Sequence, residues 1–282
     1  MANREYKNSV FSLLFSDKKN IIELYNAIGG TEYDLDTEVE INTLEKALYF
    51  DRYNDLSFLI DGRFVVLIEH QSTINENMPL RALLYVARVY EKIIDSISIY
   101  SKTLIKIPTP EFYVLYNGDD KYPATQTLKL SDAFKVPKKF LELEVKVINI
   151  NYEEQPEILE KSHTLRGYSY FVNRVKGFRT QGLSLEEAIP LAIQSCVDED
   201  VLTNFLELHG SEVRNMLYVE FNMEDALKVR EAEGKAEGKA ESIVEAIKNI
   251  VDAFGITVEK AMDTLKIDEE ERQKYKDMLD EK

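Results

Sequence analysis

The feature that most constrains the fold of this chain is the dipeptide Asp61-Gly62, which stands between two short apolar segments. A two-residue type I′ turn needs a positive φ angle at both central positions, and Asp-Gly is one of the few pairs that adopt it readily. The flanking segments 56–60 and 64–71 are candidate strands. The sequence therefore predicts a β-hairpin over residues 54–71.

Three polar side chains occupy positions on this hairpin from which they could converge, namely Asp55, Glu69 and Gln71. Side chains two residues apart on a strand share a face, so Glu69 and Gln71 point together and His70 points the other way, into the core. Two carboxylates, with the backbone carbonyl of His70 as a third oxygen, suit Mg²⁺, which retains several waters. The pattern alone also fits a hairpin with one polar face turned to solvent.

The first half of the chain alternates helical and strand patterns. A helical unit over 7–28, interrupted by a polar turn at 16–20, ends at the pair Gly29-Gly30. Beyond the hairpin, the candidates are a helix over 79–98 with proline in its first turn, then strands over 111–116 and 140–149. This order predicts an α/β fold with a mixed sheet flanked by helices.

From about residue 155 the apolar spacing is helical, so an α-helical C-terminal region is expected. Ser184 and Glu187 have capping-box spacing, and Asn222 and Asp268 are candidate helix starts. The tetrad Ala-Glu-Gly-Lys occurs twice within 232–239, which predicts a solvated helical connector or, as the alternative, a self-association segment. We expect three regions, 1–155, 156–230 and 231–282, the last ending in a helical hairpin.

Composition and charge narrow the class of protein. A single cysteine excludes an internal disulfide framework, the N-terminus lacks the apolar core of a signal peptide, and the longest apolar runs are too short to span a bilayer. We therefore expect a cytoplasmic protein with no membrane partner. The formal charge of −16 argues against nucleic acid as a partner, because phosphate binding relies on Lys and Arg.

One segment qualifies that objection, because residues 161–185 contain five cations and no acid. Cations interleaved with aromatic residues are typical of surfaces that follow a phosphate backbone. The alternative is the solvated face of a helix whose aromatics are core. The candidate DNA-binding residues are Lys161, Arg166, Arg174, Lys176 and Arg179.

At this point the sequence resembles a known family. An Asp on one strand followed by Glu-x-Lys or Glu-x-Gln on the next, in an α-β-β-α-β order, is similar to the PD-(D/E)XK nuclease superfamily. Within this superfamily, the sequence most resembles the Rpn branch. Members of that branch are recombination-promoting nucleases and are often labelled transposases. The resemblance is carried by Tyr6 to Phe15, Glu69-His-Gln71-Ser72, Arg81 with Tyr85, and the Glu-Gly-Lys repeats.

The resemblance implies a fold, a cofactor and an activity. The fold would be a PD-(D/E)XK restriction-endonuclease-like core, and the activity hydrolysis of DNA phosphodiester bonds with Mg²⁺, for which Mn²⁺ can substitute. Asp55 and Glu69 match the metal-binding positions of the family. Gln71 stands at the motif lysine, where the Rpn branch commonly has Gln; an amide can orient water but carries no charge. Asn54 replaces the namesake proline.

Three further residues are candidates for a supporting role. Glu23 on the first helix is either an outer-sphere metal contact, as in some relatives, or a surface acid. Arg81 and Tyr85, one helical turn apart, either bind phosphate or brace Glu69, or else simply pack. The competing function is a nuclease fold that has become a binding or homo-oligomerisation module, and a third is a helper in mobile-element movement.

Overall fold

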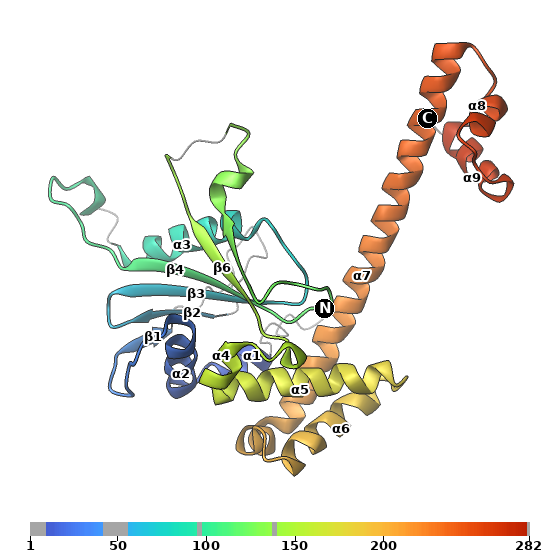
Figure 1. The fold of residues 1–282 in the computed structure, drawn as a ribbon. Coiled ribbons are helices and arrows are strands. Elements are labelled where there is room, and N and C mark those ends of the chain that lie inside the picture. Colours follow the sequence, from blue (N-terminus) through green and yellow to red (C-terminus); the bar gives the residue numbers. More distant parts are fainter. Residues whose placement is uncertain (1–9, 42–55, 95–97, 137–139, 281–282) are drawn as a thin grey trace, which may run out of the picture. The chain divides into compact units, whose positions relative to one another are not determined.

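The computed structural model describes residues 10–41, 56–94, 98–136 and 140–280 (Figure 1). The chain forms two compact units, Met1–Phe221 and Asn222–Lys282. None of the helices in the described ranges combines the length and apolar character needed to cross a bilayer.

Within the described residues, the first unit is built on one six-stranded mixed sheet of order β1-β2-β3-β4-β6-β5. The strands are β1 Val39–Ile41, β2 Leu56–Ile60, β3 Phe64–Gln71, β4 Thr109–Tyr116, β5 Thr125–Lys129 and β6 Glu144–Asn149. The three central strands β3, β4 and β6 are parallel, and the outer strands join antiparallel. The predicted α/β class with a mixed sheet is confirmed.

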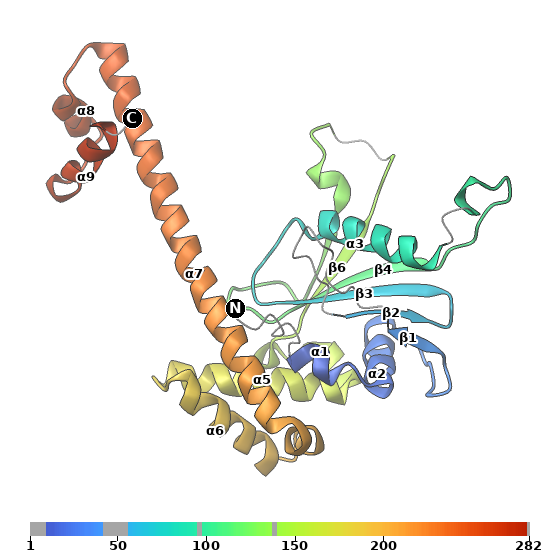
Figure 2. The ribbon, with the colours of Figure 1, turned by 180° about the vertical axis from the view of Figure 1, so that it is seen from behind.

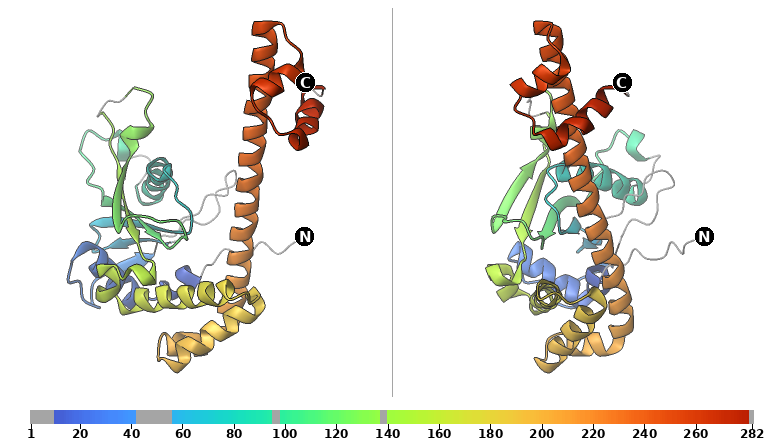
Figure 3. Two further views of the ribbon diagram at one scale, coloured as in Figure 1. Left: turned by 45° about the vertical axis from the view of Figure 1, so that its right-hand side comes forward. Right: turned by 90° about the vertical axis from the view of Figure 1, so that its right-hand side faces the viewer.

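The described helices flank this sheet and form the C-terminal region. They are α1 Val10–Leu14, α2 Lys18–Gly29, α3 Met78–Ile93, α4 Glu157–Lys161, α5 His163–Thr180, α6 Leu185–Asp198, α7 Thr203–Phe254, α8 Val258–Thr264 and α9 Glu269–Asp280, with 3₁₀ turns η1 Ser98–Tyr100, η2 Leu130–Ala133 and η3 Tyr152–Glu154. Helix α3 covers one face of the sheet, whereas α1, α2, α4 and α5 cover the other (Figures 1 and 2). Helices α5 and α6 lie side by side (Figure 3).

The turn between β2 and β3 is one residue longer than predicted. Asp61 and Gly62 have φ angles of 53° and 60°, as a type I′ turn requires, and the Arg63 N–H donates to the Ile60 carbonyl. However, the strand pairing begins with Ile60 opposite Phe64, so Arg63 is an additional residue of the turn, and its carbonyl accepts a hydrogen bond from Thr109 N of β4 at 2.7 Å. The extra residue sets the pairing along the whole hairpin.

Side chains of β3 alternate between two hydrophobic clusters, as the two-residue period predicts. Val65 and Leu67 pack with α3, whereas Val66 and Ile68 pack in the larger cluster beneath the opposite face. That larger cluster also takes in residues of α5, α6 and the first part of α7, so the core of this unit continues well beyond residue 155.

Several predicted boundaries of helices and strands were wrong, and two short strands were missed. The strand expected over 140–149 begins at Glu144, and the helix expected over 79–98 ends at Ile93. Strands β1 and β5 were not predicted, because β1 has only three residues and the polar segment Thr125–Lys129 lies at the sheet edge. The predicted interruption between 16 and 20 is present, and Gly30 caps α2 at a φ of 64°.

In the C-terminal half, the helical prediction is confirmed with one correction. Ser184 and Glu187 form the predicted capping box of α6, with Pro190 inside that helix. Asn222 does not start a helix, because α7 runs without a break from Thr203 to Phe254 and includes the Ala-Glu-Gly-Lys repeats. Neither proline nor glycine occurs between Gly210 and Asn222, so the local capping signal does not interrupt the helix.

The second unit contains the expected terminal helical hairpin. Helices α8 and α9 pack on the end of α7 through a small apolar cluster of Ala240, Val244, Ile247, Ala261, Met262, Ile267 and Tyr275. The Thr257 side chain caps α8, and Arg272 pairs with Asp263 at 2.7 Å. This unit therefore has a core of its own.

Candidate functional site

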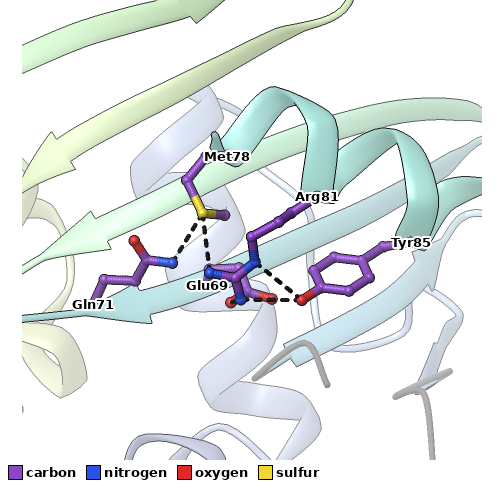
Figure 4. Close-up of polar contacts among 5 residues, drawn as sticks. All are labelled: Glu69, Gln71, Met78, Arg81 and Tyr85. Atoms are coloured by element: carbon purple, nitrogen blue, oxygen red, sulfur yellow. Dashed lines mark hydrogen bonds and ion pairs between the residues drawn. The ribbon is translucent and has the colours of Figure 1, made fainter. Parts of the chain in front are cut away.

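The candidate site lies at the C-terminal end of β3, on the face that α3 covers. Glu69 is 6 % exposed and Gln71 is half-buried, and both side chains point towards the first turns of α3 (Figure 4). The convergence of these two side chains, predicted from their spacing, is present. Burial of a carboxylate is costly unless the charge is paired and hydrogen-bonded, so the partners of Glu69 decide what the site can do.

Arg81 is the cation that pairs with Glu69. Its Nη2 lies 2.9 Å from Glu69 Oε2, with the arginine side chain about one-third exposed. The Tyr85 hydroxyl accepts hydrogen bonds from Arg81 Nε at 3.2 Å and from Nη2 at 3.0 Å. Arg81 and Tyr85 are one turn apart on α3, so the helix holds the guanidinium against the carboxylate. The structure thus shows the bracing contact among the alternatives open for these residues.

Gln71 lies beside this pair and contacts the start of α3. Its amide nitrogen donates to the sulfur of Met78 at 2.9 Å, and Arg81 Nη1 lies 3.4 Å from the same sulfur. A thioether is a weak acceptor, so this contact holds the amide only loosely. Figure 4 shows the amide oxygen of Gln71 turned away from Met78.

The second predicted carboxylate, Asp55, lies outside the described residues, as do Tyr6, Lys7 and Asn54 of the family motifs. In the part of the chain that the structure describes, no group of three or more His, Cys, Asp or Glu side chains could hold a metal ion. Glu69 and the Gln71 amide oxygen are hard donors of the type Mg²⁺ takes, and one or two carboxylates suffice. The described donors therefore fit one part of a magnesium site, in which Glu69 would have to share its charge with Arg81.

His70 is a half-buried core histidine, as expected, on the face opposite Glu69. Its ring stacks on Phe11 with 5.2 Å between ring centroids, and its Nε2 lies 3.2 Å from the Tyr168 hydroxyl. Burial, and to a lesser extent the charge of Lys176, lower the pKa of His70 to about 3. The side chain is neutral near pH 7 and takes no part in the site on the other face.

Glu23 has a structural role rather than either of the expected ones. Its carboxylate accepts hydrogen bonds from Ser162 Oγ at 2.7 Å and from Thr164 N at 2.8 Å, at the start of α5. A carboxylate at a helix N-terminus satisfies free N–H groups and interacts favourably with the helix dipole. Glu23 thus ties α2 to α5.

The five candidate DNA-binding cations do not share one face. Consecutive residues of a helix are rotated by about 100°, which turns the cations of α5 in different directions. Lys161 pairs with Glu157 at 2.6 Å and Arg166 is exposed. Arg174 donates to Ser195 of α6 at 3.2 Å, Arg179 lies over the Phe221 ring, and Lys176 pairs with Asp119 at 2.9 Å.

Sequence reasoning missed the amide side chains at the C-terminal ends of the neighbouring parallel strands. Asn117 directly follows β4, and Asn149 ends β6; both are at least 94 % buried. Asn149 donates to the Tyr122 carbonyl, and Asn151 donates to that of Gly118. The signal was present in the sequence as an asparagine at the end of each apolar strand, at the sheet edge where ligands of parallel α/β sheets bind.

Comparison with known proteins finds a family that part of the chain resembles. Residues 53–181 match the family model described as "Putative transposase, YhgA-like". The matched segment contains Glu69, Gln71, Arg81 and Lys176. Neither the search of curated proteins nor that of solved structures found a match. The match covers a little less than half of the chain and agrees with the mixed sheet and with the motifs on β3 and α3. Residues 53–181 are therefore similar to the YhgA-like transposase family, which is of the PD-(D/E)XK/Rpn type.

Proposed function

We propose that this protein is a Mg²⁺-dependent endodeoxyribonuclease that acts in DNA recombination or in the movement of mobile elements. The observation that carries the proposal is the placement of Glu69 and Gln71 side by side at the end of β3, within the segment that matches the family model. DNA is the proposed partner, and Mn²⁺ is proposed as a substitute cation.

Asp55 is the proposed second carboxylate. The β2–β3 pairing joins Leu56 to Ile68 and Ser57 to Leu67, and Asp55 and Glu69 are the next residues along the chain beyond the first of these pairs. Directly opposed residues of an antiparallel pair project to the same face of the sheet, and we propose that these two carboxylates do so. The three-residue turn sets the observed register, because a two-residue turn would pair Leu56 with Leu67.

Each residue has a separate role in the proposed reaction. Asp55, Glu69 and the backbone carbonyl of His70 supply oxygen ligands. A divalent cation held there would polarise the phosphate and lower the pKa of the attacking water. Gln71 orients that water through its amide oxygen, which can accept a hydrogen bond but cannot neutralise charge. Arg81 fixes the Glu69 carboxylate, and Tyr85 fixes Arg81.

The test is nicking of supercoiled plasmid DNA by purified protein with Mg²⁺ or Mn²⁺. We expect nicking by the wild-type protein and its loss in Asp55→Ala and in Glu69→Ala. Glu144→Ala is a matched control, because that exposed acid lies on β6 and pairs with Lys129, away from the end of β3. Nicking that survives both site changes, in variants with unchanged thermal melting, would eliminate the proposal.

A second function is favoured by one specific contact. The direct pairing of Glu69 with Arg81 is also the arrangement of a structural ion pair. With Gln71 uncharged, this contact suits a nuclease fold that serves as a binding or self-association module. Calorimetric titration with Mn²⁺ separates the two. The module predicts no heat of binding together with concentration-dependent oligomers, whereas the nuclease predicts binding that Glu69→Ala removes.

A further inference from the structure

The loop that follows β4, residues 117–120, lies directly against the end of β3. The Asn117 N–H donates to the Gln71 carbonyl at 3.0 Å. Next to it, a Cβ atom at Gly118 would overlap the backbone carbonyl oxygen of Ser72, so only glycine fits this close approach. The position of the β4 loop is therefore fixed relative to Gln71.

Lys176 reaches this loop from the opposite face of the sheet. Its Nζ donates to the Asn117 carbonyl and pairs with Asp119 Oδ1 at 2.9 Å. The lysine side chain is 23 % exposed and that of Asp119 is 60 % exposed. The ammonium group is thus anchored by the backbone on one side and by a solvent-exposed, replaceable anion on the other.

One further observation sets Lys176 apart from the other cations of α5. The residue whose carbonyl it binds, Asn117, is 6 % exposed, and the side-chain oxygen of Asn117 has no hydrogen-bond partner among the described residues. An ammonium group and a buried amide thus meet at the loop that adjoins Gln71.

We propose that Lys176 supplies from α5 the positive charge that Gln71 cannot supply, and that it binds a DNA phosphate at the adjoining ends of β3 and β4. Asp119 holds the ammonium group until a phosphate replaces it. An ammonium group has three N–H donors, of which the Asn117 carbonyl and Asp119 take two. The inference rests on the proposed function, because the phosphate is that of its DNA substrate.

The experiment measures DNA binding apart from cleavage. A short fluorescein-labelled duplex is titrated with full-length protein in Ca²⁺ without Mg²⁺, and fluorescence anisotropy is recorded over a range of NaCl concentrations. Lys176→Met should weaken binding about tenfold, as the loss of one charge-assisted hydrogen bond would. It should also reduce the slope of log K against log[NaCl] by about 0.9, the value for one phosphate contact. Lys176→Arg should keep the slope.

A substitution at Asp119 should change the DNA affinity in the opposite direction. Asp119→Asn should strengthen DNA binding, and this gain should vanish in a Lys176→Met background. Asp120→Asn removes the same charge at the next, also exposed, position and should give a smaller gain that does not depend on Lys176. Lys129→Met is the control for loss of a paired surface lysine, because Lys129 pairs with Glu144 at 3.2 Å.

The outcomes separate this inference from the proposed function. An unchanged salt slope in Lys176→Met, with DNA binding by the wild type, would overturn the role of Lys176 alone. Absence of nicking together with a reduced slope in Lys176→Met would overturn the nuclease and keep the phosphate contact. A wild type that binds no duplex would overturn the inference whatever the nicking assay gives.

Discussion

The two faces at the end of β3 bury ionisable side chains in opposite ways. On the α3 face, Glu69 meets the guanidinium of Arg81, so burial is compensated by an opposite charge. On the α5 face, His70 lies against Phe11 and Tyr168 and its pKa falls to about 3, so burial is accommodated by loss of charge. Glu69 keeps its charge near pH 7, whereas His70 is neutral. Because a charged carboxylate can bind a metal ion, the candidate site is on the face that α3 covers.

Removal of the Arg81 cation from the α3 face should have the largest effect on stability and therefore gives the strongest test of this comparison. Arg81→Ala should lower the free energy of unfolding near pH 7 by about 2 kcal/mol, which is less than the roughly 3–5 kcal/mol for breaking a fully buried pair because Arg81 is one-third exposed. Chemical denaturation measures this loss. The matched control is Arg63→Ala, since the Arg63–Asp61 pair at 3.1 Å is exposed and should contribute less than about 1 kcal/mol.

The pH dependence of that loss gives a second readout. Unfolding of Arg81→Ala and of Arg63→Ala is therefore measured at several pH values, and the loss at neutral pH is compared between the two variants. Equal losses for Arg81→Ala and Arg63→Ala at neutral pH would mean that the two faces do not differ in the proposed way.

A smaller effect is expected on the α5 face, where His70 has a folded-state pKa of about 3 against an ordinary value of 6.5. A depressed histidine pKa means that the unfolded chain binds the proton first. The contribution of His70 is therefore complete above pH 6.5 and is lost as the pH falls towards 3. Because the ring is half-buried, we expect about 1 kcal/mol between pH 7 and pH 5, measured by urea unfolding.

His70→Gln should remove this part of the acid sensitivity. His209→Gln is the control for loss of a histidine elsewhere in the molecule, because His209 lies on α7 beside Glu212 at 3.2 Å. The comparison between the two faces fails if both histidine changes alter the profile equally.

Much of this comparison could be predicted from the sequence, because it depends on local periodicity. The two-residue period of β3 placed Glu69 and Gln71 on one face and His70 on the other, and Asp61-Gly62 indicated a turn with positive φ angles. The parallel pairing of β3 with β4 could not be predicted, since it joins residues far apart in the chain, such as the Arg63 carbonyl and Thr109 N.

The same limit applies to the cations. Five basic residues without an acid among them suggest one surface in the sequence, but Lys161 lies on α4, and α5 turns the other four in different directions. Which of them reaches the strand ends depends on where α5 packs under the sheet and where the β4 loop runs. For Lys176 that information lies in its contacts with Asn117 and Asp119, which no local pattern contains.

The smallest effect concerns a single hydroxyl on the α5 face. Tyr168→Phe removes the contact with His70 Nε2 at 3.2 Å and should cost about 0.5–1 kcal/mol of unfolding free energy near pH 7, as one neutral hydrogen bond does. Tyr90→Phe is the matched control, because its hydroxyl donates to the Pro108 carbonyl at 2.7 Å in the α3 layer.

The pair of tyrosines also tests whether the histidine contact is specific. In a double-mutant cycle, Tyr168→Phe should couple to His70→Gln, whereas Tyr90→Phe should be additive with it, since residues without shared partners rarely couple. Neither tyrosine change should affect plasmid nicking, because both hydroxyls lie outside the proposed site. If Tyr168→Phe cost as much as Arg81→Ala, a neutral contact would be as important as the ion pair, and the contrast between the two faces would have to be abandoned.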